Sequence, residues 1–339
     1  MTTIKDVAAR AGLSVMTVSR VLNGERHVSA QAREKVQAAI EALGYRRNVF
    51  ARGLPGARSF LICMLIPESI PDYVAEFQQG AVEKCRSAGY HLVVQPFDSR
   101  TGMAAQAVAA AVASLRPDGF LLLPPVSDDL AALDMLDRAS VPYGRLAPSV
   151  APERGACVAI DEVEAARAMT AALLDLGHRR IGFIGGPPNH GASAWRLEGY
   201  RRAMAERGLT PEPGLVQDGD FMFEGGEAAG ARLLDLTPPP SAIFAGNDDM
   251  ALGVMAVAQR RGVSLPRDLS VVGFDGGESA DLVWPQLTTV RQPVREMAAT
   301  AAEAVIAMVE AGERGASSQR LDFTLLMRAS SAPPTEASA

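Results

Sequence analysis

The 339-residue sequence has few of the features that mark membrane, secreted and metal-binding proteins. No apolar run approaches the roughly 18–20 residues that a membrane-spanning helix needs. The opening residues, MTTIKDVAAR, have no apolar core of the kind that a secretory signal carries. The three cysteines, Cys63, Cys85 and Cys157, are spaced too widely for a disulfide framework or a zinc site. We therefore expect a cytoplasmic chain with reduced, buried thiols, no metal and no membrane partner.

Signatures of catalysis are also missing. The four histidines show no metal-ligand spacing, and neither a Ser/His/Asp order nor a paired-carboxylate motif is present. The glycine-rich stretch IGFIGGP (181–187) lacks both the P-loop lysine and the spacing of a dinucleotide fingerprint. The sequence therefore predicts no catalytic residue and no cofactor, and it indicates that the chain is not an enzyme.

The charges are divided unevenly along a chain of ordinary globular composition, 48% hydrophobic and 21% charged. Residues 1–58 hold ten Lys and Arg against four Asp and Glu, a net charge of +6. Because the whole chain carries −6, the remainder carries −12. A polyanion would be attracted to one end and repelled by the other.

Two short helical patterns broken by a glycine lie near the start of the chain. Apolar residues recur at helical spacing in 4–11 and again in 15–22. Gly12 can take the left-handed conformation that ends a helix, and Ser14 can cap the next one. Ala8, Gly12 and Val18 match the three tightest positions of a helix-turn-helix. The second helix would bury one apolar face, made of Val18, Val21 and Leu22.

The opposite face of this second helix carries side chains that suit DNA. Arginine and asparagine, here Arg20 and Asn23, can make bidentate contacts with guanine and adenine edges. Thr17 or Ser19 can hold phosphate. An ordinary helical hairpin with a solvated polar face would show the same pattern. A third helix, capped by Ser29 and apolar at Val36, Ile40 and Leu43, favours a three-helix DNA-reading headpiece instead.

From residue 59 onward, short apolar runs alternate with helical stretches. The runs lie at 60–66, 90–96, 119–124, 180–186, 241–246 and 269–275, and the helical stretches near 73–88, 102–115, 162–176, 193–207, 224–235, 248–262 and 293–311. This alternation predicts parallel sheets covered on both faces. The series repeats after about residue 160, which indicates two similar lobes with a ligand cleft beyond the carboxyl ends of their strands.

The first 54 residues resemble a known headpiece. TIKDVAARAGLSVMTVSRVLNG, VSAQAREKVQAAIEALGYRRN and ARGL are similar to the headpiece and hinge of the lactose-repressor (LacI/GalR) family of bacterial transcription regulators. The resemblance implies that Val15, Met16 and Arg20 read the major groove. It implies further DNA contacts by Thr17, Ser19, Asn23, His27, Tyr45, Asn48, Ala51 and Leu54.

The hinge segment NVFARGL (48–54) would order on DNA and insert Leu54 into the minor groove from both subunits. An apolar wedge costs stacking energy but kinks the duplex and enlarges the contact. A plain linker is the alternative reading of this segment. The family usually has proline before the asparagine, where this chain has Arg47. This difference makes the entry to the hinge less rigid and adds a phosphate contact.

The remainder is similar to the effector-binding core of the same family through ALLDLGHRRIGFIGGP, RLEGYRRAM, AIFAGNDDMALGVMA and LSVVGFDGGESADLVWPQLTTVRQP. That core resembles periplasmic sugar-binding proteins, with two lobes and three crossovers. The family's effector contacts map onto Tyr73, Asp161, Ser193, Arg196, Phe221, Asn247 and Asp275.

The chemistry of these effector residues suits a polyol. Arg196 can donate two hydrogen bonds in a plane, Asp275 can accept from vicinal hydroxyls, and an aromatic ring can cover the apolar face of a sugar. Structural alternatives remain open for four of them. Asn247 could cap a helix, Asp275 could be a turn residue, Phe221 could be a core residue, and Arg196 could belong to a surface ion pair.

The resemblance implies a headpiece at 1–46, a hinge helix and linker at 47–58, and an effector-binding and dimerisation core at 59–329. Within the core the lobes would be 59–159 with 291–322, and 160–290 with 323–329. The Ala/Ser/Pro-rich residues 330–339 predict a disordered tail. Because no heptad leucine run favours a tetramer, we expect a homodimer on a pseudo-palindromic operator.

The expected fold is thus an all-α headpiece followed by a two-lobed α/β core with parallel sheets. The expected function is repression of carbohydrate-utilisation genes, released by a sugar or sugar-derivative inducer, in a protein associated with the nucleoid when bound to its operator. A purine-like corepressor is the alternative within this function. A sugar-binding protein for transport and an enzyme using the cleft are alternatives outside it.

Overall fold

The computed structural model describes residues 3–22, 28–45, 58–67, 72–97, 103–188 and 190–335. The chain forms two compact units, residues 1–59 and 60–339. The predicted DNA contacts Asn23, His27, Asn48, Ala51 and Leu54, and the hinge residue Arg47, lie outside the described residues.

The first unit is a three-helix bundle with α1 at Ile4–Ala11, α2 at Val15–Leu22 and α3 at Ala30–Leu43. Gly12 ends α1 with φ of 64°, a left-handed conformation that glycine adopts without strain. The hydroxyl of Ser14 accepts the N–H of Thr17 at 3.1 Å and so caps α2, and Ser29 caps α3. The small core consists of Val7, Ala8, Val18, Val36 and Ala39. The predicted helix-turn-helix, with its turn and caps, is therefore confirmed.

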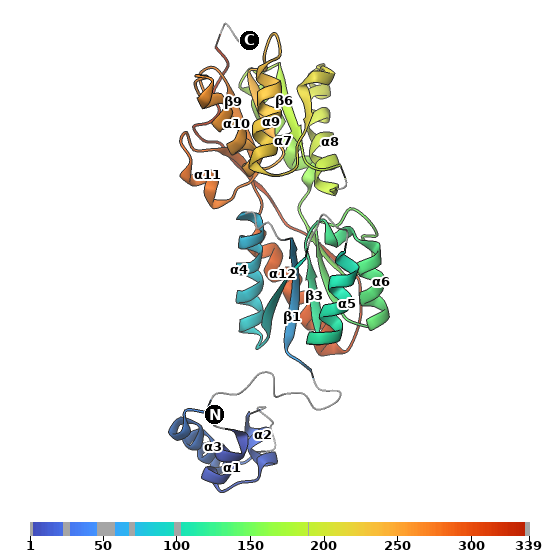
Figure 1. Ribbon diagram of the computed structural model, residues 1–339, viewed down its shortest axis with the longest axis vertical. Coiled ribbons are helices and arrows are strands. Elements are labelled where there is room, and N and C mark those ends of the chain that lie inside the picture. Colours follow the sequence, from blue (N-terminus) through green and yellow to red (C-terminus); the bar gives the residue numbers. More distant parts are fainter. Residues whose placement is uncertain are drawn as a thin grey trace. The chain divides into compact units, whose positions relative to one another are not determined.

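The second unit has two lobes, each a six-stranded sheet between helices (Figure 1). The N-terminal lobe has the strand order β11-β5-β4-β3-β1-β2, all parallel. Its strands are β1 Leu61–Pro67, β2 His91–Phe97, β3 Gly119–Leu122, β4 Tyr143–Leu146, β5 Ala156–Ala159 and β11 Ser317–Arg320. Its helices are α4 Asp72–Ser87, α5 Ala104–Leu115, η3 Val126–Asp128, α6 Leu130–Ala139 and α12 Val294–Ala311. The pair α4 and α12 packs on one face, and α5 and α6 pack on the other.

The C-terminal lobe repeats this plan with the order β12-β10-β9-β8-β6-β7, in which only β12 is antiparallel to its neighbour. Its strands are β6 Ile181–Gly185, β7 Val216–Asp218, β8 Ala242–Ala245, β9 Ser270–Asp275, β10 Thr288–Arg291 and β12 Thr324–Leu326. Its helices are α7 Glu162–Asp175, α8 Gly191–Glu206, η4 Pro213–Leu215, α9 Phe223–Leu234, α10 Asp248–Arg260 and α11 Glu278–Leu282. The pairs α7 with α8 and α9 with α10 cover its two faces.

The chain passes between the lobes three times: from β5 to α7, from β10 to α12 and from β11 to β12. At these passages Arg320 of one crossover pairs with Asp161 of another, Nη1 to Oδ2 at 2.7 Å. Three connections of only a few residues let the lobes move against one another while remaining joined at one edge. The predicted class, with two similar parallel-sheet lobes, is thereby confirmed.

The expectation of a disordered tail is wrong for residues 330–335. Ser330 is fully buried, and its hydroxyl accepts the N–H of Thr288 at 2.8 Å and donates to the carbonyl of Val271 at 2.6 Å. The carbonyl of Ala332 lies 3.0 Å from His178 Nε2. The Ala/Ser/Pro-rich composition suggested disorder, but residues 330–335 form hydrogen bonds with buried polar groups of the C-terminal lobe. Residues 336–339 lie outside the described residues.

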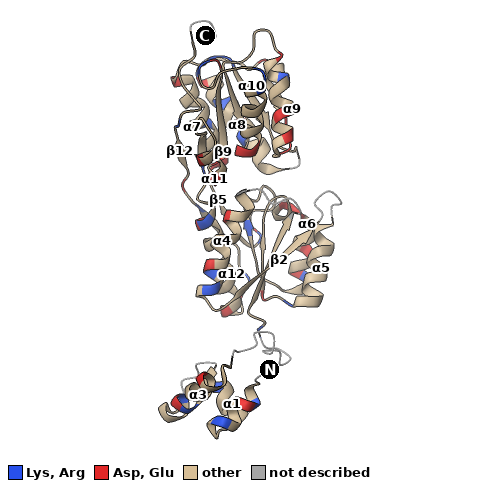
Figure 2. Cartoon of the chain, turned by 60° about the vertical axis from the view of Figure 1, so that its left-hand side comes forward, with Lys and Arg blue, Asp and Glu red and all other residues tan. Residues whose placement is uncertain are grey.

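Charged side chains lie on the outward faces of helices such as α4, α9 and α12 (Figure 2). Among the described residues, no helix is long and apolar enough to cross a membrane.

Candidate effector cavity and DNA-reading helix

A cavity of about 310 Å³ lies where the strands of both lobes end. Five of the seven predicted effector residues line it: Tyr73, Arg196, Phe221, Asn247 and Asp275. Glu162, His190 and Asp220 join them as polar residues. The apolar lining consists of Val74, Leu123, Pro124, Pro125, Ala147, Pro187, Ala192 and Met222. Most of these residues follow a parallel strand directly, which is where ligands of such sheets bind.

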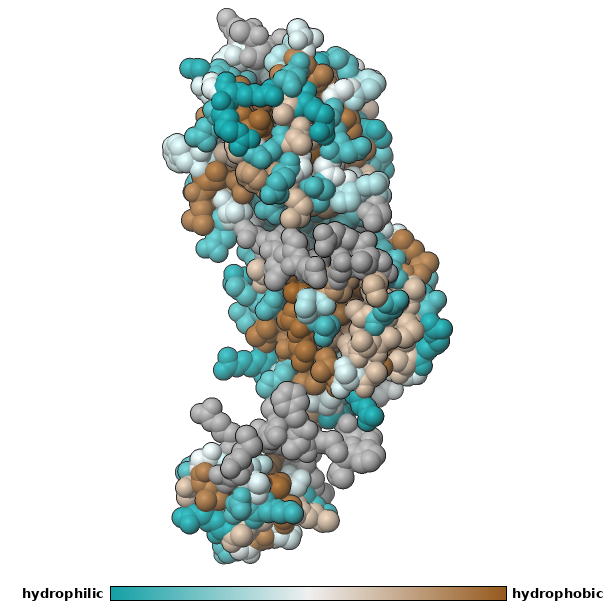
Figure 3. Space-filling view, viewed as in Figure 1, coloured by the Kyte–Doolittle hydropathy of each residue, from teal (hydrophilic) through white to brown (hydrophobic). Residues whose placement is uncertain are grey.

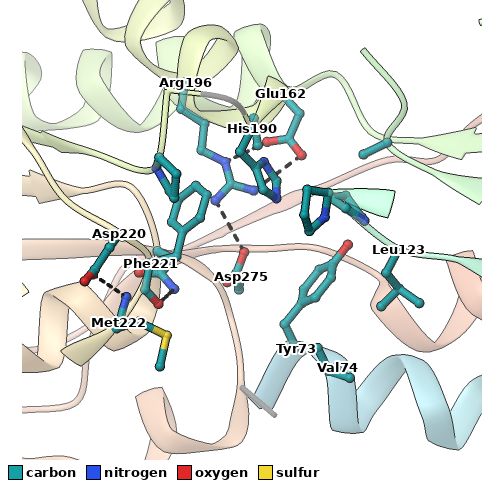
Figure 4. A pocket seen from close by; sticks show the side chains of 16 residues that line it. Tyr73, Val74, Leu123, Glu162, His190, Arg196, Asp220, Phe221, Met222 and Asp275 are labelled. Atoms are coloured by element: carbon teal, nitrogen blue, oxygen red, sulfur yellow. Dashed lines mark hydrogen bonds and ion pairs between the residues drawn. The ribbon is translucent and has the colours of Figure 1, made fainter. Parts of the chain in front are cut away.

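Arg196 projects from the first half of α8 into a fully internal network (Figure 4). Its Nε donates to Glu162 Oε2 at 2.8 Å, its Nη2 donates to Oε1 at 3.4 Å, and its Nη1 donates to the carbonyl of Gly246. The guanidinium carbon lies 3.6 Å from the centre of the Phe274 ring, a cation–π contact. Burial opposes the charge, but Glu162 and Asp275 outweigh burial and raise the pKa of Arg196.

Asp275 ends β9 in a conformation that a non-glycine residue rarely takes, with φ of 115°. Gln292, in a crossover between the lobes, donates its backbone N–H to the Asp275 carbonyl at 3.0 Å and its Nε2 to Oδ1 at 2.8 Å. Oδ1 also lies 3.6 Å from Arg196 Nη1. Burial raises the pKa of Asp275 well above its ordinary value, against the opposing effect of Arg196. The site therefore adjoins a segment that links the lobes.

Asn247 has the two roles that its position allowed. Its Oδ1 accepts the N–H of Met250 at 3.0 Å and caps α10, while its Nδ2 donates to the Phe221 carbonyl at 3.0 Å. Phe221, with φ of 66°, places its ring where a side chain on Gly186 would otherwise stand. The ring is half-buried and lines the cavity, so it is not simply a core residue.

His190 and Tyr73 are neutral members of the cavity wall. The ring of His190 meets that of Phe221 edge-on, with 5.0 Å between centroids. Burial and the nearby charge of Arg196 lower the pKa of His190 to about 4. Burial and the carboxylates of Asp275 and Glu162 raise the pKa of Tyr73 well above its ordinary value, so its hydroxyl keeps its proton.

Two predicted effector residues do not line the cavity. Asp161 caps α7 by accepting the N–H of Glu164 at 3.0 Å and pairs with Arg320. Ser193 is buried in α8, and its hydroxyl has no hydrogen-bond partner among the described residues. Conversely, sequence reasoning missed Glu162, whose pairing with Arg196 spans 34 positions and has no local signal. It also missed Asp220 as a lining residue.

In the first unit, α2 presents the predicted DNA-reading side chains on its outer face. Met16 is 66% exposed and Val15 42%, whereas Val18 is fully buried. Arg20 is exposed, Thr17 and Ser19 are half-buried, and Tyr45 packs against the core behind Gly44. Among the described residues, no group of His, Cys, Asp and Glu side chains could hold a metal ion.

Comparison with known proteins decides the family. Residues 3–48 match "Bacterial regulatory proteins, lacI family", and residues 170–331 match "Periplasmic binding protein-like domain". Catabolite control protein A of Priestia megaterium is 34% identical over 304 residues, covering 88% of this chain and 90% of the relative. This chain belongs to the lacI family. It is therefore a helix-turn-helix transcription regulator with a core of the periplasmic-binding type, as the sequence predicted.

Other relatives extend the match to nearly the whole chain. The ribose operon repressor of Escherichia coli K12 is 35% identical over 335 residues, covering 98% of this chain and all of the relative. The solved CelR–cellobiose complex has a TM-score of 0.75 at 32% identity, covering 97% of this chain and 100% of the other. The Lac repressor dimer bound to operator and an anti-inducer has a TM-score of 0.84 at 28% identity, covering 98% and 99%. These relatives are regulators rather than enzymes.

Proposed function

We propose that this lacI-family chain is a repressor that binds a pseudo-palindromic operator as a homodimer and releases it when a carbohydrate occupies the cavity. One observation carries the proposal: a DNA-reading headpiece and a two-lobed cavity adjoining the lobe crossovers occur in one chain. A ligand held between lobes changes their relative position, and that change alters how two headpieces are presented to DNA. The repressor would be associated with the nucleoid while it holds its operator.

The proposed operator contacts follow the exposed face of α2. Val15, Met16 and Arg20 would read base edges, with Met16 packing on a thymine methyl and Arg20 on guanine. Thr17 and Ser19 would hold phosphate, and Tyr45 would support the backbone contact from the end of α3. Asn23, His27, Asn48, Ala51 and Leu54 complete the proposed set from residues outside the described ranges. The matched Lac repressor is a dimer bound to its operator, which supports the same arrangement here.

An apolar surface on the C-terminal lobe supports the dimer. Leu282 at the end of α11 is 77% exposed and the nearby Trp284 is 85% exposed. Figure 3 shows hydrophobic residues gathered at the edge of this lobe where Figure 1 places α11. Large exposed apolar side chains commonly mark protein contacts. We therefore include this surface in the interface between two copies.

The cavity supports a carbohydrate as effector, as does the neighbouring CelR–cellobiose structure. The lining combines carboxylates, an amide and a guanidinium with an aromatic ring and prolines, groups that suit the polar edge and the apolar face of a sugar. The proposed contacts are Tyr73, Arg196, Phe221, Asn247 and Asp275. Asp161 and Ser193 remain proposals that would require the lobes to move. The cavity would bind its ligand without converting it.

The test uses the thermodynamic linkage between the DNA-binding site and the effector cavity. Selection from a randomised duplex library identifies the preferred duplex, and fluorescence anisotropy then measures its affinity with and without cellobiose, ribose and other sugars. We expect the effective sugar to weaken duplex binding by 5–150-fold, about 1–3 kcal/mol. Calorimetry should show the duplex weakening sugar binding by the same factor.

Two outcomes would overturn the proposal or redirect it. Equal sugar affinities for free and duplex-bound protein would contradict release by a sugar. A purine base that tightens duplex binding would identify the chain as a corepressor-activated regulator. Chromatography of the ligand recovered from the protein checks for turnover, and a converted ligand would contradict a purely binding cleft.

A further inference from the structure

The cavity's polar side chains are largely bound to one another, which limits what they can offer to a ligand. Each nitrogen of the Arg196 guanidinium has an internal acceptor, either a Glu162 oxygen or the carbonyl of Gly246. The Phe274 ring covers one face of the guanidinium. The Arg196 side chain is therefore held in place in the cavity wall, and its positive charge is already neutralised by Glu162.

Asn247 is occupied in the same way. Its amide oxygen caps α10 through Met250, and its amide nitrogen donates to the Phe221 carbonyl. Arg196 keeps two of its five N–H donors and Asn247 one of its two for a ligand, but the charge with which an arginine grips a phosphate or a carboxylate is already paired with Glu162. What remains toward the cavity is rich in acceptors, since carboxylate oxygens accept hydrogen bonds and cannot donate them.

The charges of the described lining residues also disfavour an anionic ligand. Among the lining residues that the structure describes, Glu162, Asp220 and Asp275 face a single cation, Arg196. His190 adds no positive charge at neutral pH because burial and Arg196 lower its pKa to about 4. Burial favours a proton on Asp275, yet with that proton bound the described lining still carries net negative charge. An anion entering this cavity would lose its hydration and meet charge of its own sign.

We propose that the cavity selects an uncharged, hydroxyl-rich ligand with one apolar face and rejects sugar phosphates, sugar acids and nucleotides. Hydroxyls donate to the carboxylates and accept from the Tyr73 hydroxyl, while the apolar face lies on Phe221 and the prolines of the N-terminal lobe. This inference rests on the proposed function only in taking the cavity to be the effector site. It narrows the effector to a class defined by charge.

The first experiment compares matched ligands without any DNA. Calorimetry on the full chain measures glucose against glucose 6-phosphate and glucuronate, ribose against ribose 5-phosphate, cellobiose against cellobionate, and adenosine against adenosine monophosphate. We expect the neutral member of each binding pair to bind at least about tenfold more tightly than its anion. A phosphorylated or carboxylated member that binds as tightly as its neutral partner, or more tightly, overturns the inference.

Variants identify the source of the discrimination. Glu162→Gln keeps an amide oxygen for Arg196 Nε but leaves the guanidinium charge uncompensated, so the neutral-to-anion affinity ratio should fall about tenfold. Asp220→Asn keeps an acceptor for the Met222 N–H and removes an exposed charge, so the ratio should fall a few-fold at low salt and less at high salt. A merely structural role for Glu162 would weaken both ligands equally and leave the ratio unmoved.

The matched control removes a carboxylate from the same lobe outside the cavity. Glu198 pairs with Arg202 on the exposed surface of α8, so Glu198→Gln should keep the wild-type ratio. A shift as large as that of Glu162→Gln would show that general protein charge, and not the lining, sets the selectivity. These calorimetric measurements contain no duplex, so they test the inference separately from the proposed function. If the protein prefers neutral sugars but no sugar changes its operator affinity, only the proposed function is contradicted. An anion-preferring protein that releases its operator contradicts this inference alone.

Discussion

Asp248 is a buried carboxylate that does not line the cavity, yet it fixes the loop that carries Asp275. Its Oδ2 accepts the N–H groups of Gly276 at 2.8 Å and Gly277 at 3.0 Å, and its Oδ1 accepts the hydroxyl of Thr289 at 2.6 Å. Burial raises the pKa of Asp248 to about 7, although these three donors act to lower it. A single side chain thus joins α10, β10 and the turn after β9.

This raised pKa predicts a pH-dependent stability that Asp248→Asn should reduce. The folded pKa of about 7 lies above the ordinary 3.8, so folded protein holds the proton more tightly than unfolded protein. The resulting stabilisation is complete below about pH 4 and is lost as the pH rises through 7. Between pH 5 and pH 8 the wild type should therefore lose roughly 2 kcal/mol more than the variant, which cannot ionise there. Urea unfolding at the two pH values measures the difference.

Asp275 is present in both proteins and its pKa is raised by the charge of Asp248, so their comparison measures Asp248 together with its effect on Asp275. Glu198→Gln removes an exposed carboxylate from the same lobe and should follow the wild-type pH profile. Parallel profiles for wild type and Asp248→Asn would contradict the assignment.

The family resemblance mapped seven effector residues onto the sequence, and five of them line the cavity. Asn247 and Asp275 follow apolar runs that end β8 and β9, so motif and topology both located them. The pairing of Arg196 with Glu162 depends on how α8 lies against the start of α7, and no spacing encodes that contact. Asp161 lies outside the cavity lining, where it caps α7 and pairs with Arg320.

At the scale of elements, apolar periodicity predicted the long helices and the most buried strands. It missed β4, β5, β7, β10, β11 and β12, which have three or four residues each, and β4 contains the fully buried Arg145. That cation is acceptable inside the lobe because its nitrogens donate to the carbonyls of Ser127, Val150, Ala151 and Arg154. These acceptors come from the short helix η3 and from the loop between β4 and β5, so only the tertiary fold shows them. Helix α6 did carry a local signal, the cap Asp129 before LAALDMLDRA.

The C-terminal segment 329–335 behaves as an element of the lobe, and Ser330 is its main attachment. Ser330→Ala would leave the N–H of Thr288 and the carbonyl of Val271 buried without that hydroxyl. We expect the free energy of unfolding of the core to fall by about 1–3 kcal/mol. Differential scanning calorimetry of the full chain measures the change.

Ser331→Ala supplies the control for this attachment. Within the described part of the chain, the Ser331 hydroxyl meets only the Thr288 hydroxyl, at 2.8 Å, in a half-buried position. Its loss should cost less than about 1 kcal/mol. Equal, negligible effects of the two variants would mean that residues 329–335 are only loosely attached in solution.

At the scale of the whole molecule, the two units have separate hydrophobic cores. Counting the described residues, the core of unit 1–59 consists of five buried side chains, whereas the lobes of unit 60–339 bury several large clusters. A bundle this small is marginally stable because most of its surface remains exposed. DNA binding therefore depends on a unit that a modest change can unfold, while ligand binding depends on a much larger one.

This difference predicts that Val18→Ala separates the two activities. Val18 is fully buried in the headpiece core, so its truncation should cost about 2 kcal/mol and melt a large share of the first unit at 37 °C. Duplex binding should then fall for every sequence, while sugar affinity measured by calorimetry stays within about twofold of wild type. Arg20→Ala changes the exposed face of α2 instead. It should keep the headpiece transition and lose about 1–3 kcal/mol for the preferred duplex, with a smaller loss for random DNA. If Val18→Ala weakened sugar binding as strongly as duplex binding, the units would fold as one, and control of DNA binding could not operate through a separately stable core.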